Sequence, residues 1–150
     1  MSALVVLDTN VWVSAFLNPH GFPAKLLEAW AAGAFQVVIS VPLMEELART
    51  LSERRLVLKY GYSDQDIREY LEHIASRSRV VTLAQGLALS RDPKDDPVIQ
   101  TALAGGAQFL VSRDEDLTRD QPLAAHLATR RITVLTVARL LQHLETRREE

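Results

Sequence analysis

Acidic side chains occupy the places in this sequence where short apolar runs end and helical patterns begin. Asp8 directly follows the first apolar run, and Asp114 and Asp116 follow a later one. Glu45 and Glu46 lie near the start of a helical pattern. A further acidic group precedes another helical pattern and consists of Asp92, Asp95 and Asp96. If the apolar runs form parallel strands, four separate segments bring carboxylates to one edge of a sheet, where α/β proteins build their sites.

Carboxylates that gather without a cation repel one another and raise each other's pKa values. A bound cation neutralises such a cluster. The sequence has no cysteine and no histidine near these acids, and ligands that are all oxygen suit Mg2+ or Mn2+ rather than zinc. Such ions can generate a hydroxide nucleophile and stabilise an in-line displacement at a phosphodiester. The pattern therefore indicates metal-dependent phosphodiester chemistry.

Most of these acids also have a purely structural interpretation. Asp8 can be the N-cap of a helix that follows a strand. Asp96 and Pro97 have the form of an N-cap followed by proline at the first helical position. Asp114 and Asp116 can be turn residues. Any one of them alone is explained as well by local structure, and only their combination favours a site.

The choice between Glu45 and Glu46 is open from the pattern alone. Both can be favoured near a helix N-terminus by its dipole. They lie on opposite flanks of the apolar stripe formed by Leu43, Leu47 and Leu51, so helical geometry does not select one of them.

The apolar runs are continuous rather than alternating, which is typical of strands covered on both faces of a parallel sheet. We expect strands at residues 4–7, 37–39, 80–81, 109–111 and 132–135. We expect helices over residues 24–32, 42–51, 63–75, 97–104 and 137–144. Ser63 with Asp66 resembles a capping box. Strands that alternate with helices predict a three-layer α/β/α sandwich with a mainly parallel central sheet of about five strands.

Size and composition fit one soluble domain. The 150 residues suffice for a single buried core, and residues 146–150 read as a charged, frayed tail. The absence of cysteine excludes disulfides and thiolate zinc sites. A net charge of −2 argues against a protein that coats DNA electrostatically. No apolar run is long enough for a membrane span and the N-terminus lacks a secretory signal, so we expect a cytoplasmic protein.

Four short motifs together resemble those of PIN domains. They are Asp8-Thr9-Asn10, Glu46-Leu47, Asp96-x-x-Ile99 and Ser112-Arg113-Asp114-Glu115-Asp116-Leu117. The similarity covers residues 3 to about 143. It is strongest to bacterial and archaeal toxin components of toxin-antitoxin systems that are related to VapC-type toxins. Ser112 stands where many relatives have Thr, and Leu117 stands where many have Phe, but neither change removes a carboxylate.

The resemblance implies a metal-dependent endoribonuclease with Asp8, Glu46, Asp96 and Asp114 as its catalytic, metal-binding acids. Asp116 would be an additional ligand or a supporting group. Glu46 is selected by its match to the family's Glu-Leu pair, and Asp96 because Ile99 follows it by three. The positions that in the family orient acids or water are matched by Asn10 and Ser112. The cofactor would be Mg2+ or Mn2+, the substrate RNA, and the partners an antitoxin and a second copy of the chain.

Two questions remain open at the level of sequence. The alternative to a nuclease is a catalytically silent PIN fold that binds RNA or serves as a scaffold, and the complete acidic set argues against it. The segment 22–62 is also rich in large apolar side chains, which either pack in the core or leave a groove for an antitoxin segment or a homodimer. Those side chains are Phe22, Leu26, Trp30, Leu43, Leu51, Leu56, Leu58 and Tyr60.

Overall fold

The computed structural model describes residues 2–83 and 96–149, with side chains through residue 148. In this part of the chain five strands form one sheet, and every neighbouring pair is parallel. The strands are β1 (Ala3–Leu7), β2 (Phe35–Ser40), β3 (Arg79–Val81), β4 (Phe109–Val111) and β5 (Thr133–Leu135). Their order is β3-β2-β1-β4-β5, which places β1 at the centre. The predicted five-stranded parallel α/β fold is therefore confirmed.

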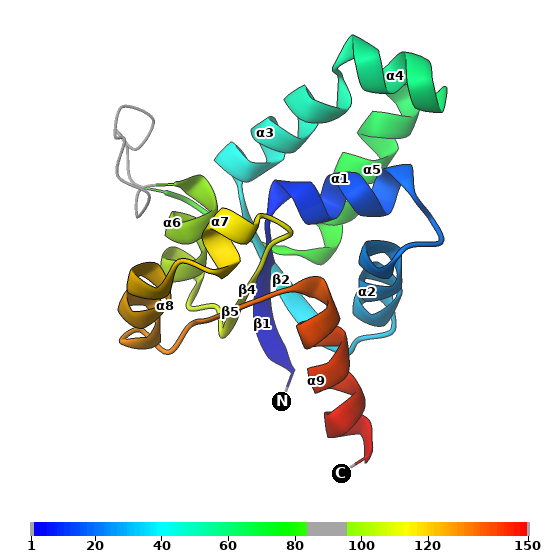
Figure 1. The fold of residues 1–150 in the computed structure, drawn as a ribbon. Coiled ribbons are helices and arrows are strands. Elements are labelled where there is room, and N and C mark those ends of the chain that lie inside the picture. The colour runs from blue at the N-terminus through cyan, green and yellow to red at the C-terminus, as the bar shows by residue number, and fades with distance from the viewer. Residues whose placement is uncertain (1, 84–95, 150) are drawn as a thin grey trace.

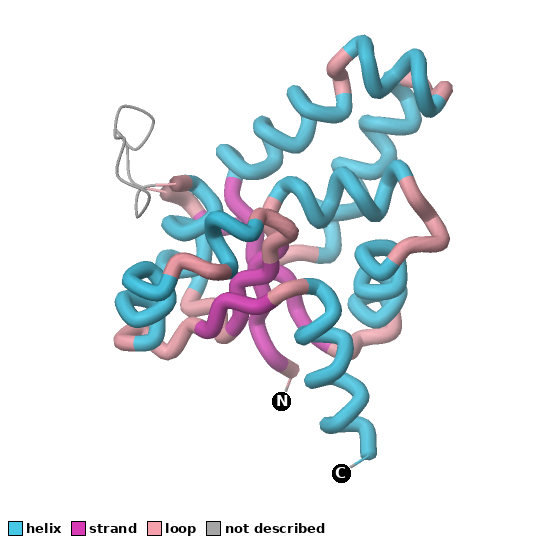
Figure 2. Tube along the Cα trace, viewed as in Figure 1, coloured by secondary structure: helices cyan, strands magenta, loops and turns pink. Residues whose placement is uncertain are grey.

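Helices cover both faces of this sheet (Figure 1). They are α1 (Thr9–Leu17), α2 (Phe22–Ala31), α3 (Val41–Leu51), α4 (Arg54–Tyr60), α5 (Asp64–Arg77), α6 (Pro97–Gly105), α7 (Glu115–Thr118), α8 (Gln121–Ala128) and α9 (Val137–Glu149). α6 packs on β1, β2 and β4, and α8 contacts β5. On the opposite face α2 contacts β2 and α9, while α3 to α5 extend beyond the carboxyl ends of the strands (Figure 2). None of the described helices is long and apolar enough to cross a bilayer.

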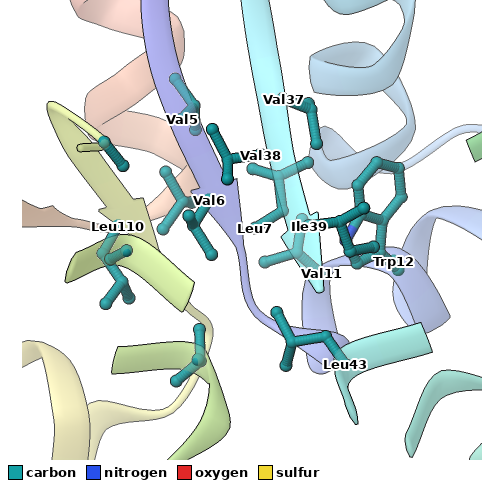
Figure 3. Packing of buried hydrophobic residues seen from close by; sticks show 14 of the residues in the cluster. Val5, Val6, Leu7, Val11, Trp12, Val37, Val38, Ile39, Leu43 and Leu110 are labelled. Atoms are coloured by element: carbon teal, nitrogen blue, oxygen red, sulfur yellow. The ribbon is translucent and has the colours of Figure 1, made fainter. Parts of the chain in front are cut away.

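The core lies between the sheet and its two helical layers (Figure 3). β1 and β2 supply a nearly fully buried set of branched side chains, which are Val5, Val6, Leu7, Val37, Val38 and Ile39. Burial of each such side chain stabilises the fold by about 1.5–3 kcal/mol. Trp12 of α1 packs edge-to-face on Trp30 of α2, with 5.3 Å between ring centroids. These contacts hold α1 against the carboxyl end of β1.

α6 is held closely on β2, and this fixes the position of its N-terminus. Ser40 at the end of β2 hydrogen-bonds Thr101 of α6 through their hydroxyl oxygens, 2.7 Å apart, and both side chains are buried. At the other end of α6, a methyl group on Gly105 would overlap the side chain of Val38. A residue without a side chain is therefore required there for the helix to lie this close to the sheet. The N-cap of the same helix is Asp96.

Two helix starts have the caps that the sequence predicts. The side chain of Ser63 accepts from the N–H of Asp66 at 3.1 Å, and the N–H of Ser63 donates to Asp66 Oδ2 at 2.8 Å. This reciprocal pair is a capping box. Asp96 caps α6 by accepting from the N–H of Val98 at 3.1 Å, with Pro97 in the first turn.

The helical periodicity of the sequence did not predict α1, α4, α7 and α8, and only the possible N-cap role of Asp8 pointed to α1. Apolar residues surround α1 instead of forming one stripe, because α2 and α3 both pack against it. α4, α7 and α8 have eight residues or fewer, which is too short for a helical period to show. Short helices in proteins depend on tertiary packing more than on local propensity.

The last helix is longer than the sequence pattern predicts. α9 does not end at Leu144 but continues to Glu149. Leu140 and Leu144 are buried and anchor this helix to the core. Arg147 and Arg148 lie in its last turn, where positive charge interacts favourably with the helix dipole.

Candidate active site

Asp8 is held at the carboxyl edge of the sheet by both the strand before it and the helix after it. Its backbone N–H donates to the carbonyl of Val111 at 2.8 Å, which extends the β1–β4 ladder by one residue. Its side chain caps α1, with Oδ1 accepting from the N–H of Thr9 at 2.8 Å. The carboxylate therefore has a fixed position at the end of the central strand.

The hydroxyl of Ser112 joins the loop after β4 to this carboxylate. Ser112 is fully buried, and its Oγ donates to Asp8 Oδ2 at 2.8 Å. The same oxygen accepts from Asn10 Nδ2 at 3.2 Å and from the N–H of Asp114 at 3.0 Å. A serine hydroxyl offers one donor and two acceptor positions, and Ser112 uses all three.

Asn10 closes this network from the first turn of α1. Its Nδ2 also lies 3.4 Å from Asp8 Oδ2, and its Oδ1 accepts from the N–H of Arg113 at 3.0 Å. Asn10 and Ser112, proposed from the sequence as orienting groups, both contact Asp8. Together they connect residues about one hundred positions apart in the chain.

Burial raises the pKa of Asp8 from 3.8 to about 6. The hydrogen bonds from Ser112 and from the N–H of Thr9 lower the pKa, and the negative charges of Asp96 and Glu46 raise it further. The charges of Asp96 and Glu46 thus act on Asp8 although the three residues come from separate segments of the chain. This is the pattern of a carboxylate cluster in which a cation would be favourable.

The structure distinguishes the two glutamates of α3. Glu46 is half-buried and its charge acts on Asp8, whereas Glu45 is exposed. The helix begins at the N-cap Ser40, directly after β2, and the angle at which it leaves the sheet decides which flank faces Asp8. This geometry favours Glu46, a choice that the helical pattern alone could not make.

Asp96 and Asp114 are N-caps of helices that begin at the same edge of the sheet. Asp96 caps α6 and is exposed. Asp114 caps α7, and its Oδ1 accepts from the N–H of Asp116 at 2.9 Å. Both Asp114 and Asp116 are exposed to solvent. Asp92 and Asp95, the other acids considered for this loop, lie outside the described residues.

The acids do not form a closed cage for an ion. Among the described residues, no three His, Asp or Glu side chains are placed to hold a metal ion. The chemistry of these side chains fits a hard cation, because the donors are carboxylates. The negative charges of two other acids also act on the half-buried Asp8. Mg2+ in proteins commonly takes one or two carboxylates, with water and substrate phosphates completing its coordination. The arrangement fits an ion bound in that way.

Sequence reasoning did not single out Arg113 as a residue of this site. Its backbone N–H is bonded to Asn10, and its guanidinium donates to the hydroxyl of Ser14 on α1. The exposed side chain therefore lies across the start of α1, beside the acidic edge. The position of Arg113 between Ser112 and Asp114 in the sequence could have indicated its place in the site, because every residue of that short loop is near the end of β4.

Comparison with known proteins identifies the family. A family model described as a PIN domain matches residues 4–116, about three quarters of the chain. The chain belongs to the PIN-domain family. The matched segment contains Asp8, Glu46, Asp96, Asp114 and Asp116. PIN domains are in general nucleases, and PIN nucleases generally use divalent metal ions.

Two individual proteins are similar to the chain, one in sequence and one in fold. An uncharacterized protein of Methanocaldococcus jannaschii is 29% identical over 114 residues, which is 75% of this chain and 72% of that protein. The fold is similar to that of a chain in the crystal structure of VapBC2 from Rickettsia felis bound to a DNA fragment from their promoter. That match has a TM-score of 0.55 and 18% identity, and it covers 89% of this chain and 98% of the other.

The raised pKa of Asp8 predicts that this residue destabilises the metal-free PIN domain near neutral pH. Its folded-state pKa of about 6 lies above the value of 3.8 expected in the unfolded chain. The folded state therefore retains the proton longer, and stability is lost as the pH rises from about 4 to about 6. Each pKa unit corresponds to about 1.4 kcal/mol. In EDTA, the stability of Asp8→Asn relative to the parent should therefore rise by up to about 3 kcal/mol between pH 4 and pH 7, in addition to a constant loss of the hydrogen bonds that Asp8 Oδ2 accepts.

Denaturant unfolding of both proteins at the two pH values measures this difference. Asp64→Asn is the matched control, because Asp64 is exposed on α5, and it should change stability little at either pH. A stability difference between Asp8→Asn and the parent that is the same at pH 4 and pH 7 would contradict a desolvated carboxylate with a raised pKa.

Proposed function

We propose that this PIN domain is a metal-dependent endoribonuclease that hydrolyses RNA phosphodiester bonds with Mg2+ or Mn2+. The observation that supports this most strongly is the half-buried carboxylate of Asp8, whose pKa is raised by burial and also by the negative charges of Asp96 and Glu46. Like charges placed close together are unfavourable unless a cation neutralises them. An acidic cluster at the carboxyl edge of a parallel sheet is the pattern of a functional site.

The residues of the site have distinct roles in this proposal. Asp8, Glu46, Asp96 and Asp114 would hold the cation, and Asp116 would be a further ligand or a supporting group. A divalent ion, when bound, lowers the pKa of a water and neutralises charge that develops on phosphate oxygens. Ser112 and Asn10 hold the Asp8 carboxylate by hydrogen bonds of 2.8 and 3.4 Å. Such fixed orientation avoids rearrangement of the site during the reaction.

The alternative is a catalytically silent PIN fold that binds RNA or serves as a scaffold. The lack of a preassembled metal cage among the described residues is the observation in its favour. Cleavage of RNA distinguishes the two functions. Only a nuclease cleaves RNA, and it requires the acids and a divalent cation to do so.

Cleavage of RNA should depend on Mn2+ and on one glutamate of α3 but not its neighbour. We expect the parent to cut mixed RNA with Mn2+ and to be inactive in EDTA. Asp8→Asn and Glu46→Gln should be inactive, because each loses a charge that binds the ion. Glu45→Gln, at an exposed position on the same helical turn, should remain close to the parent.

Gel analysis of the RNA, followed by mapping of the cut ends, measures these activities. Full activity of Asp8→Asn in Mn2+ would refute the proposed metal site. An inactive Glu45→Gln with an active Glu46→Gln would show that α3 presents its other flank to Asp8. Binding of RNA without cleavage under every condition would support the silent module.

We also propose that the protein is the toxin of a toxin-antitoxin pair and acts in the cytoplasm. The expected antitoxin surface is only partly present in segment 22–62, because Leu26, Trp30, Leu43 and Leu51 are buried in the core. Leu58 and Tyr60 of α4 are 70% and 45% exposed. Tyr60 borders a hollow of about 400 Å3 that is also lined by Phe16, Tyr62 and Tyr70. We place the antitoxin segment at this hollow, and homodimer formation is the competing use of the same surface.

Charge placed on α4 should disrupt antitoxin binding without changing the nuclease site. Co-expression of the protein with the small protein encoded beside its gene should yield a complex on gel filtration. Leu58→Glu should abolish the complex, because it buries a charge in an apolar contact, and RNA cleavage by the isolated variant should remain. Ala104→Ser, at an exposed residue of α6, is the control. If Leu58→Glu instead turns a dimer into a monomer and leaves the complex intact, this surface serves the homodimer.

A further inference from the structure

A second hollow adjoins the acidic edge at Ser112. It has a volume of about 250 Å3 and lies between the start of α2, the loop after β4 and the start of α9. Its walls include Phe22, Arg113 and Val137, and it also contains Ser112. Since Ser112 donates to the Asp8 carboxylate, the hollow and the acidic site share a wall.

Phe22 presents its ring to this hollow from the first position of α2. The side chain is 61% exposed, although a phenylalanine is normally buried in a domain with a core of this size. The Lys25 ammonium lies 5.1 Å from the centre of the ring. An exposed ring with a cation beside it is the combination that proteins use to bind single-stranded nucleic acid.

Arg113 brings a positive charge to this hollow. Lys25 lies beside the Phe22 ring and lines the neighbouring hollow, which also contains Glu28 and Glu145. The side chain of Arg113 donates to the neutral hydroxyl of Ser14, so this contact does not neutralise the guanidinium. Glu115 also lines the hollow, but its carboxylate lies 3.6 Å from the guanidinium of Arg119. The charged residues that line the hollow are thus Arg113 and Glu115, and Arg113 is the one that can contact a phosphate.

We propose that this hollow binds a nucleobase of single-stranded RNA next to the phosphodiester that is cut. The base stacks on Phe22, and Arg113 and Lys25 contact the flanking phosphates. The substrate must be unpaired at this position, because the ring can reach the face of a base only when the base is not stacked in a helix. This inference rests on the proposed ribonuclease function and adds to it a base-binding hollow and the residues that line it.

The chain offers a closely matched control for Phe22. Tyr60 is also an exposed aromatic residue with a lysine beside it, and the Lys59 ammonium lies 5.4 Å from its ring centre. Tyr60 borders the α4 hollow and not the one next to Ser112. The two residues therefore share chemistry and differ in the hollow that they border.

Affinity for a labelled single-stranded RNA oligonucleotide, measured by fluorescence polarisation in EDTA, tests the proposal without cleavage. Loss of one stacked base corresponds to about 1–3 kcal/mol, so Phe22→Ala should weaken binding roughly 5- to 150-fold. Phe22→Tyr should bind like the parent, Phe22→Leu should bind like Phe22→Ala, and Tyr60→Ala should have no effect. The same RNA in a duplex should bind weakly to all variants.

Phe22→Trp provides a signal that a structural role would not give. The two native tryptophans, Trp12 and Trp30, are buried, so a tryptophan at position 22 would be the one that a base can reach. RNA should quench its fluorescence, and it should cause little quenching in the parent. Absence of quenching at saturating RNA would overturn stacking at this position.

The outcomes separate this inference from the proposed function. Cleavage that requires Asp8 but is unchanged in Phe22→Ala, with unchanged RNA affinity, would overturn the inference alone. Binding that requires Phe22 without cleavage under any condition would retain the inference and refute the nuclease. If Phe22→Ala changes the oligomeric state on gel filtration and leaves RNA affinity unchanged, the hollow is a protein interface. No binding of RNA by the parent would overturn both.

Discussion

The common direction of the five strands is the constraint on which the proposed site depends. In the parallel pairing of β1 with β4, Leu7 lies opposite Val111, so the next residues, Asp8 and Ser112, meet at the edge of the sheet. The backbone continues this pairing, because the N–H of Asp8 reaches Val111 and that of Ser112 reaches Leu135. A shift of one residue would turn these side chains to opposite faces. Core packing of β1 therefore also sets the position of the acid.

Helix capping and the proposed chemistry use the same side chains. Asp8, Asp96 and Asp114 are the N-caps of α1, α6 and α7. Each N-cap carboxylate receives a backbone hydrogen bond and the favourable field of a helix N-terminus, which offsets part of its repulsion from the others. The structural and functional interpretations of these acids are thus compatible. This local stabilisation of each carboxylate allows several carboxylates to lie at one edge of the sheet without a bound ion.

Much of the fold and the candidate acids could be predicted from sequence, because both depend on short local patterns. The continuous β-branched runs predict a parallel sheet, and acids directly after those runs must lie at its carboxyl edge. The choice between Glu45 and Glu46 depends on the angle of α3, which no local pattern contains. The contacts of Ser112 with Asp8 and Asn10 depend on strand register across the chain. The exposure of Phe22 depends on how α9 packs beside α2.

A thermal melt with and without millimolar Mn2+ tests most directly whether the acids converge to hold an ion in the folded protein. An ion that binds only the folded state stabilises it, by about 2.7 kcal/mol at an ion concentration one hundred times the dissociation constant. This stabilisation raises the melting temperature. The account predicts a rise in the parent that is lost in Asp96→Asn and kept in Asp120→Asn. Asp120 is likewise a helix N-cap, at the start of α8, and asparagine caps a helix as well as aspartate. No shift in the parent, or equal shifts in both variants, would contradict the account.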